Sequence, residues 1–452
     1  MLSDKFRRQL RQEAEQWRTE GLIDASVYEQ LSNRYQFSDI ETAARNRFTL
    51  ILLGLGSVLL GLGIITFVAA NWQVWSREWK VLLLLSGFVG INAAGFYLWR
   101  RPTERWQRRL GQGLLLLGAL VLGANIALMS QLFHQSGLLY QLFIVWGLGV
   151  LAMAYSLRLT LLGILAELLI GLGYLQGQPA FVPIGEFSWL RFLMQHMPVF
   201  AGVMFIPLAY WCRSRWIFRL GAIMVVYTLE ANLIRSNLVV SSGGMAAIAC
   251  ALPPALLWAY QDFFWKLRPS ATQLFSGIAH SLAITFLSVL FYFLSFYGIW
   301  NTSPVPSAQD TSPLLLPLLV DISILSSLTV WVWLQRVRLH QVDRITIFVV
   351  SMIAISAIVP FWHLSSGRIP STAVWIFNLL LFLLGVGLIR KGLTQGQRRL
   401  FWGGMVLLTL QIFTRMLEYD TDLLFKSVVL LLCGFGVLAA GLWFERYLRV
   451  RR

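Results

Sequence analysis

The sequence predicts an all-α, polytopic integral membrane protein with about fourteen transmembrane helices and a short N-terminal cytoplasmic helical hairpin. Three observations lead to this fold class. Of the 452 residues, 57% are hydrophobic and only 13% are charged, whereas about 25% are charged in a typical soluble domain. Long apolar segments recur along the chain, and most basic residues fall between them. So much apolar surface cannot be buried in a soluble core and must face lipid.

The N-terminal residues form the predicted head. Within residues 1–40, apolar side chains at spacings of three and four mark one face of a first helix. Gly21 ends that helix, and Ser26 with Glu29 gives a capping-box pattern for a second one. Three apolar side chains of the second helix are expected to pack on the first: Val27, Leu31 and Tyr35. A hairpin this small buries little core by itself, which favours docking on the membrane domain or on a partner.

The predicted domains are a head with a lead-in helix over residues 1–47, a transmembrane domain over 48–444 and a basic tail over 445–452. A membrane-spanning helix needs about 20 mostly apolar residues. The segments that approach this criterion are 48–70, 80–99, 110–131, 139–157, 159–176, 197–212, 216–234, 242–261, 273–297, 314–335, 343–359, 371–389, 399–417 and 422–443.

The charge distribution sets the predicted orientation. With the N-terminus inside, the inside segments hold 29 of the 37 Lys and Arg residues and the outside connections hold five. This asymmetry is typical of membrane proteins, whose cytoplasmic loops are enriched in basic residues. The net charge of +16 is therefore interpreted as a topology signal, and no nucleic-acid partner is expected. We expect a multi-pass protein of the bacterial cytoplasmic (inner) membrane with both termini cytoplasmic.

The chain shows no motif for catalysis or for a cofactor. The three cysteines, Cys212, Cys250 and Cys433, lie apart in apolar segments, which argues against a disulfide framework and a zinc site. The first 47 residues are polar, so no cleavable signal peptide is predicted. HExxH, Gly-x-Ser-x-Gly and Cys-x-x-Cys patterns do not occur in the sequence. The sequence therefore predicts neither an enzyme nor a cofactor or metal site.

Polar side chains inside the predicted spans are the candidate sites, because such residues are costly in lipid and often functional. The candidates are Asn125, His134, Glu167, Glu230, Asn232, His280, Asp321, Arg415 and Lys426. One interpretation is a proton or substrate path, and the other is hydrogen bonding that holds helices together. Hydrogen bonding between helices is favoured for each residue taken singly. For Glu167 the two interpretations are almost equally favoured, because carboxylates in the middle of a bilayer are rare.

Two of these regions have more specific expectations. In "GANIALMSQLFHQSG", a spacing of 100° per residue places Ser130, Gln131 and His134 on one helical face and Asn125 nearly opposite. Asn125 then needs a buried partner, for which Arg415 is a candidate. In "TRMLEYDTDLLFKS", acidic and basic residues alternate in sign around a predicted turn at 418–421, which predicts a cluster of ion pairs with Lys426 extending outward.

Proline and glycine point to irregular or close-packed helices. Pro207 and the Pro253-Pro254 pair fall inside predicted spans, where they remove backbone hydrogen bonds that another group must replace. Broken helices often line transporter sites, and a kink satisfied by neighbouring helices is the alternative. Recurring Gly-x-Gly pairs, such as Gly171 and Gly173, are interpreted as close helix packing.

Three stretches carry a family resemblance: "EQWRTEGLIDASVYEQLSNRY" (15–35), "GIITFVAANWQVW" (63–75) and "GANIALMSQLFHQSGLLYQLFIVW" (123–146). Together they resemble a family of bacterial predicted membrane proteins, domain-of-unknown-function family 2157, over about the first third of the chain. The closing 40 residues are also similar to the ends of such proteins. The resemblance implies a polytopic membrane protein with a short cytoplasmic helical head, and it implies no substrate, reaction or catalytic residue.

Two functional hypotheses follow. The first is a transporter or flippase-like permease, based on the number of spans, the buried carboxylates and the proline-interrupted helices. The second is a membrane scaffold or sensor that binds a cytoplasmic protein partner through residues 1–40. A lipid-modifying enzyme ranks third. The lipid bilayer is the expected environment in each case, and the sequence gives no oligomeric state.

Overall fold

The computed structural model describes residues 4–35, 59, 66, 75–134, 137–177, 188–236, 238–262, 275–301, 312–338, 343–418 and 422–450. Some predictions therefore lie outside the described residues: nearly all of the first span (48–70), the lead-in helix, the whole of the "FVAANW" stretch, and residues 419–421 of the turn before the last span. All regular structure in the described ranges is helical, which agrees with an all-α protein.

The helices follow the predicted spans closely. In chain order they are α1 (Asp4–Thr19), α2 (Ala25–Tyr35), α4 (Arg77–Arg100), α5 (Arg105–Leu132), α6 (Leu139–Leu157), α7 (Thr160–Gly177), α8 (Trp189–Gln195), α9 (Met197–Cys212), α10 (Arg215–Arg235), α11 (Leu238–Ser241), α12 (Gly243–Ala259), α13 (Ser276–Leu294), α14 (Tyr297–Trp300), α15 (Ser312–Arg338), α16 (Arg344–Ser365), α17 (Pro370–Gln395), α18 (Arg398–Glu418) and α19 (Leu423–Val450). Each predicted span after the first coincides with one of these helices.

Among the described residues, eleven helices are long and apolar enough to cross a membrane. The number rises to twelve if α8 and α9, which meet at a bend of 85°, form one broken span. The helix α12 is apolar but has only 17 residues. These helices make the protein a polytopic membrane protein in a lipid bilayer, although fewer of them meet the length criterion than the fourteen spans expected.

The chain divides into two compact units, residues 1–86 and 87–452. In the first unit, α1 and α2 pack through a small cluster around the fully buried Ala14. Gly21 follows α1 with φ of +73°, a left-handed conformation that glycine adopts without strain. Asp24, rather than Ser26, precedes α2, and its side chain accepts a hydrogen bond from the Ala25 amide. Val27 is exposed and lies outside the cluster, which includes Leu31 and Tyr35.

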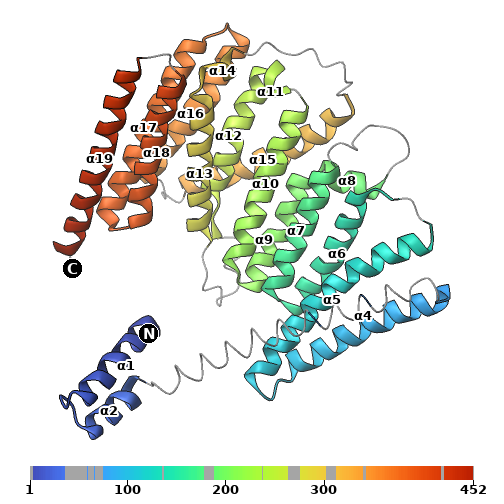
Figure 1. Ribbon diagram of the computed structural model, residues 1–452. Coiled ribbons are helices and arrows are strands. Elements are labelled where there is room, and N and C mark those ends of the chain that lie inside the picture. Colours follow the sequence, from blue (N-terminus) through green and yellow to red (C-terminus); the bar gives the residue numbers. More distant parts are fainter. Residues whose placement is uncertain are drawn as a thin grey trace. The chain divides into compact units, whose positions relative to one another are not determined.

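In the second unit, neighbouring helices in the chain stand largely side by side (Figure 1). The main core runs through α6, α7, α9, α10, α12, α13, α16 and α17. Close approach depends on glycine at several helix contacts: a Cβ added to Gly173 would lie 2.7 Å from Ile144 Cδ1, and one on Gly404 would lie 2.6 Å from Gly385 O. The glycine pairs therefore serve packing at these contacts. A Cβ added to three other glycines would meet no atom within 4 Å: Gly171, Gly434 and Gly436.

The prolines do not break their helices. Both α9 and α12 continue through Pro207 and through Pro253-Pro254. Pro254 has no amide hydrogen to bond the carbonyl of Cys250, four residues earlier. The hydroxyl of Ser356 on α16, which is fully buried, donates to the Ile353 carbonyl of its own helix at 2.8 Å and lies 3.5 Å from the Cys250 carbonyl. The neighbouring helix thus brings a polar group next to the carbonyl that proline leaves without its amide donor.

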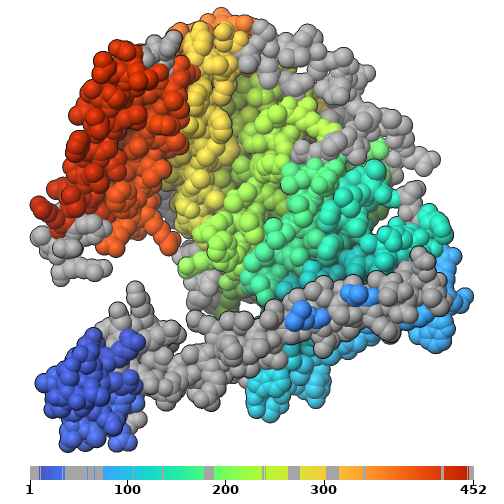
Figure 2. All heavy atoms as spheres, in the orientation of Figure 1, coloured from blue at the N-terminus to red at the C-terminus, as the bar shows by residue number. Residues whose placement is uncertain are grey.

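The last helix has little protein around it. In Figure 1, α19 stands at the edge of the second unit beside α18, and none of the apolar window of α19 is buried. The space-filling view shows the red C-terminal helices on the outer surface of this side (Figure 2). Side chains such as Leu424 and Phe435 are more than half exposed, as expected for a helix that faces lipid.

Candidate functional site

The break between α8 and α9 is the most irregular point in the described part of the bundle. The two helices are long enough to cross a membrane only when they are taken together. His196 is at once the residue after α8 and the residue before α9, and Pro198 lies in the first turn of α9. Proline is favoured there because its fixed φ suits the first turn and its missing amide hydrogen is not needed. The two helices meet at 85°, so α9 starts afresh instead of continuing α8. His196 is thereby placed inside the bundle at the point of the bend.

His196 pairs with Asp321 of α15 across this break. Its Nδ1 lies 2.7 Å from Oδ1 of Asp321, a hydrogen bond that the imidazole donates when Asp321 is ionised. The side chain of Asp321 is completely buried and that of His196 is 15% exposed. The second oxygen, Oδ2 of Asp321, has no hydrogen-bond partner among the described residues. The pair therefore ties the bend to α15 and still leaves one buried acceptor unused.

A second set of hydrogen bonds joins the same break to α7 and α10. Asn232 on α10 donates from Nδ2 to the carbonyl of Gln195 at 3.2 Å. Its Oδ1 accepts from the hydroxyl of Tyr174 on α7 at 2.7 Å. The same hydroxyl lies 3.2 Å from the carbonyl of Thr228. Asn232 thus bridges three elements at the level of the bend.

Glu167 lies two turns before Tyr174 on α7 and faces α10. It is 4% exposed, and neither of its carboxyl oxygens has a hydrogen-bond partner among the described residues. A Cβ on Gly221 of α10 would come within 3.2 Å of Glu167 Oε1 and within 2.8 Å of Phe205 Cβ. Only the absence of a side chain at Gly221 makes room for the carboxyl group. A buried polar group without a partner costs roughly 1–3 kcal/mol, and more if it is charged.

Glu230 is half-buried on α10, two residues before Asn232. Its Oε1 is buried and has no hydrogen-bond partner within the described ranges. Here α10 packs on α12. Gly221 and Glu230 are nine residues apart, which is about 13 Å along the helix axis. Glu167 and Glu230 therefore lie at two levels of one helix and not at one point.

The structure thus brings part of the predicted set together. Asn232 and Asp321 both contact the α8–α9 break, through Gln195 and His196 respectively. Glu167 belongs to the same group of helices, because α7, α9 and α10 pack on one another. We call the set Glu167, Tyr174, Asn232, His196 and Asp321 the polar series. Its members come from α7, from α10, from the α8–α9 break and from α15.

His280 belongs to a different cluster, where α12, α13 and α15 meet. Its ring lies against that of Trp258, with centroids 4.5 Å apart. The guanidinium of Arg336, a residue only 8% exposed, donates to the Trp258 carbonyl at 2.9 Å and lies 3.4 Å from His280 Nε2. Trp258 is in the last turn of α12, where a cation is favourable to the helix dipole. This arrangement indicates a structural role for His280.

Asp262, which is also buried, is a carboxylate with hydrogen-bond donors for both of its oxygens. Asp262 accepts hydrogen bonds from the amides of Phe275 and Ser276, at 2.9 and 3.1 Å, at the start of α13. It also accepts one from the hydroxyl of Tyr210. The hydroxyl of the neighbouring Tyr260 lies 2.7 Å from that of Tyr210. Such satisfaction by helix amides is typical of a cap, in contrast to Glu167.

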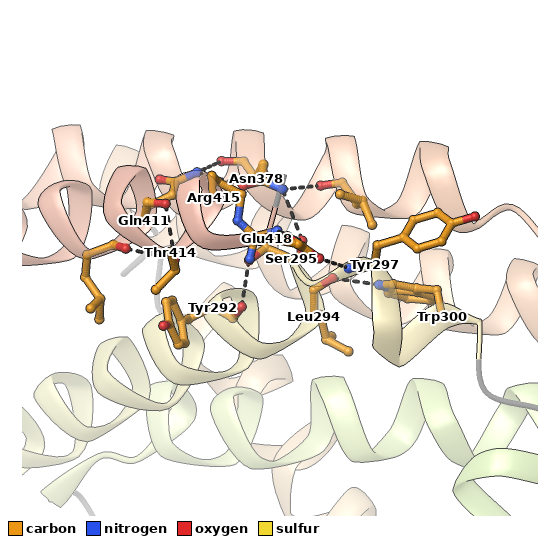
Figure 3. A network of polar contacts seen from close by, with 12 residues as sticks. Tyr292, Leu294, Ser295, Tyr297, Trp300, Asn378, Gln411, Thr414, Arg415 and Glu418 are labelled. Carbon is orange, nitrogen blue, oxygen red and sulfur yellow. Dashed lines mark hydrogen bonds and ion pairs between the residues drawn. The ribbon is translucent and has the colours of Figure 1, made fainter. Parts of the chain in front are cut away.

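Arg415 lies in a network that holds the junction of α13 and α14 against α18 (Figure 3). It donates to the Ser295 carbonyl at 2.6 Å and forms an ion pair with Glu418. Glu418 accepts in turn from the amide of Tyr297 at 2.7 Å. Asn378 also donates to Ser295, at 3.3 Å. The ring of Phe296 covers the guanidinium of Arg415 at 4.1 Å.

These contacts correct two expectations about Arg415. Its described partners come from the α13–α14 junction and from its own helix, and not from Asn125 on α5. The expected ion-pair cluster is represented in the described ranges by Arg415 and Glu418, while Asp422 is exposed before α19. Lys426 is half-buried in the first turn of α19. Asn125 is 6% exposed on α5, so the expectation of a buried group is confirmed for this residue.

His134 is placed differently from the prediction. The helix α5 ends at Leu132, and His134 follows in a left-handed conformation with φ of +53°. The spacing of 100° per residue therefore does not extend to it, and its side chain does not share a helical face with Ser130. His134 is exposed. It joins no cluster of the other candidate residues in the described structure.

Sequence reasoning missed His196, Tyr174 and Arg336. A signal for His196 was present, because the "HMP" sequence puts proline two residues later, as expected at the start of a new helix. The predicted span 314–335 ends one residue before Arg336, so the sequence places Arg336 in an inside connection and not within the helix bundle. No pattern pointed to Tyr174, since its hydroxyl becomes significant only when α7 and α10 are packed together.

The comparison with protein families gives one match. The model of the family described as "Predicted membrane protein (DUF2157)" matches residues 15–163, which confirms the resemblance over that part of the chain. The match ends before Glu167 and so includes only Asn125 and His134 of the candidate residues. Neither the curated proteins nor the solved structures yielded a match.

Proposed function

Starting from a match to a predicted membrane protein family over residues 15–163, we propose that this chain is a permease of the transporter or flippase type. In this proposal, the polar series marks the path of a polar or charged substrate. The α8–α9 break supplies the part of the path where the backbone is not a continuous helix. Such discontinuous helices commonly form substrate and ion sites in transporters.

The observation that carries the proposal is the burial of carboxyl groups with unused oxygens on α7 and α15, two helices that both pack on α9. Glu167 has neither oxygen bonded, and Asp321 has one left over, although both residues are at least 96% buried. Groups that only hold helices together are expected to be satisfied, as Asp262 is by two amides and a hydroxyl. Unsatisfied carboxyls retained in lipid-embedded helices support a role in binding or in carrying protons.

The proposal places the protein in the bacterial cytoplasmic membrane. Both termini are cytoplasmic, because 29 Lys and Arg residues then lie inside against five outside. It retains fourteen spans, with α8–α9 and α12 each crossing once and residues 48–70 supplying the first. An even number of spans is required for both termini to lie on one side. The domains remain the head over 1–47, the membrane domain over 48–444 and the tail over 445–452.

The test is flux in reconstituted vesicles. Purified protein is placed in liposomes that contain a trapped pH dye and a trace of fluorescent phospholipid. Proton entry under an imposed membrane potential is recorded, and so is transbilayer lipid movement, by adding a reductant that bleaches only the outer leaflet. The wild type should exceed protein-free vesicles in at least one assay, and the triple variant Glu167→Gln, Glu230→Gln, Asp321→Asn should lose that activity.

The matched control is Asp343→Asn, which changes an exposed carboxylate before α16 and should leave the flux unchanged. If the wild type matches protein-free vesicles in both assays, the permease proposal fails. If the triple variant keeps the wild-type flux, the polar series is not the substrate path, although the protein is still a permease.

The second candidate is a scaffold or sensor that captures a cytoplasmic protein through the head. The supporting observation is that α1 and α2 form a cluster of their own while Leu22 and Val27 remain 69% and 42% exposed. Deleting residues 1–40 should then abolish capture of a partner in pull-downs from membranes, whereas a Leu22→Ala, Val27→Ala variant should weaken it. Recovery of the same proteins by the full chain and the deletion would contradict this candidate.

A further inference from the structure

A groove between α18 and α19 lies apart from the polar series. It encloses about 570 Å³, within the range of roughly 300–1,000 Å³ that is typical of small-molecule sites. Its lining is almost entirely apolar, with Thr409 the one hydroxyl-bearing residue in it. Representative lining side chains are Trp402, Val406, Phe413, Leu430, Cys433 and Leu438. The groove opens beside a helix whose apolar window is not buried at all.

Aromatic contacts between α18 and α19 close one end of the groove. The rings of Phe401 and Phe444 stack with centroids 4.1 Å apart and planes inclined by only 3°. One turn away, a Cβ on Gly441 would lie 3.0 Å from the ring of Trp402. The two helices therefore touch at this end and separate along the groove.

Lys426 lies at the opposite end of the groove. It precedes Leu430 by four residues and Cys433 by seven, so all three lie on one face of α19. Helical side chains lean toward the N-terminus of their helix, which directs Lys426 away from the closed end. Among the described residues, the structure records no ion pair of this ammonium group. The groove thus combines a long apolar floor with a single cation at its mouth.

The length of the groove indicates its occupant. From Trp402 to Phe413 the lining of α18 spans eleven helical steps, which is about 16 Å along the axis. One leaflet of a bilayer is about 15 Å deep, half of the hydrocarbon core. An added transmembrane helix would need the whole thickness and, at a diameter of about 10 Å, about 1,250 Å³ over this length. An acyl chain fits both dimensions better than a helix of a second copy does.

We propose that the α18–α19 groove binds one phospholipid with an anionic headgroup, whose acyl chain lies against Trp402, Phe413 and Leu438 and whose phosphate contacts Lys426. The headgroup lies at one surface of the membrane, because Lys426 is in the first turn of α19. Binding here does not depend on the permease function, since none of the polar series lines the groove.

Native mass spectrometry of the full chain, released from nanodiscs of mixed composition, tests this site. The probes are dioleoyl phosphatidylglycerol and dioleoyl phosphatidylcholine in equal amounts. The wild type should retain one phosphatidylglycerol in preference to phosphatidylcholine. The variant Lys426→Gln should lose about fivefold in that preference, since a basic residue at a membrane surface contributes about 1 kcal/mol toward an anionic lipid. This residue is half-buried and away from the core, so the fold is retained.

A second variant tests the acyl-chain part. A Cβ on Gly434 meets nothing within 4 Å, so Gly434→Leu adds a side chain into the groove and should remove retention of either lipid. The controls are Arg446→Gln, which removes an exposed charge near the other end of α19, and Leu432→Phe, which enlarges an exposed side chain outside the groove. Both controls should behave as the wild type. Equal retention of the two lipids by the wild type, or unchanged retention in both groove variants, would overturn the proposal.

Discussion

At the residue scale, Glu167 and Gly221 have to be understood together. The carboxyl group of Glu167 occupies the space that a side chain on Gly221 would fill, and Phe205 closes the same space from α9. Glycine is unfavourable in the middle of a helix by roughly 0.5–1 kcal/mol relative to alanine. Its presence opposite a buried carboxyl is therefore explained by the room that it leaves for that group.

Replacing Gly221 by alanine should destabilise the protein. The new methyl group would lie 2.8 Å from Phe205 Cβ and 3.2 Å from Glu167 Oε1, and overpacking of this kind costs about 1–3 kcal/mol. Thermal unfolding of the purified protein in detergent should show a lower midpoint. The control is Gly171→Ala on α7, where an added Cβ meets nothing within 4 Å and should be neutral or stabilising. Equal midpoints for the two variants would contradict this account of the α7–α10 contact.

At the element scale, helices are joined at their irregular points by polar groups from elsewhere in the chain. The carbonyl that Pro254 leaves without an amide donor on α12 lies 3.5 Å from the hydroxyl of Ser356 on α16. The last turn of α13 and the first turn of α14 are held by Arg415, Glu418 and Asn378 (Figure 3). Such bonds give specific alignment between helices whose apolar faces resemble one another and resemble lipid.

The α13–α14 junction should open locally when Arg415 is replaced by glutamine. The change removes the donor to the Ser295 carbonyl and leaves Glu418 without its cation. A hydrogen bond to a charged group contributes about 1.5–3 kcal/mol. Amide hydrogen exchange in the peptide covering residues 292–301 should become at least tenfold faster, because 1.4 kcal/mol corresponds to a factor of ten. The variant Ser351→Ala, which changes an exposed side chain on α16, should leave it unchanged. Unaltered exchange in Arg415→Gln would mean that apolar packing alone fixes the junction.

Most of the helices could be predicted from the sequence, but the contacts between them could not. Spans could be predicted because each needs a long apolar segment, and α6 and α9 begin and end at the expected residues. The polar series could be predicted only in part, because Glu167 and Asp321 stand out from apolar neighbours without indicating what they face. The His196–Asp321 pair joins residues 125 positions apart. Nothing in the local sequence determines such a pairing, which depends on how α15 packs against the α8–α9 break.

At the scale of the whole molecule, the apolar composition and the eleven membrane-length helices make the chain a polytopic membrane protein. The distribution of basic residues predicts its orientation. Reporter fusions that are active only in the cytoplasm should give a signal at the N-terminus, after Arg213 and at the C-terminus. Fusions after Arg368 should be silent. A signal at only one of the two termini would contradict an even number of spans.

If the polar series marks a substrate path, a thiol placed between α7 and α10 should be reached from water. Thr228→Cys, at a buried position whose backbone carbonyl lies 3.2 Å from the Tyr174 hydroxyl, is introduced into a chain whose three cysteines are replaced by alanine. A charged thiol reagent that cannot cross lipid is applied to both faces of the membrane. Ala279→Cys, in the core of α13, is the buried control, and Asp343→Cys the exposed one. Thr228→Cys should react measurably, while Ala279→Cys should not. Equal inertness of the two would contradict a path through this interface.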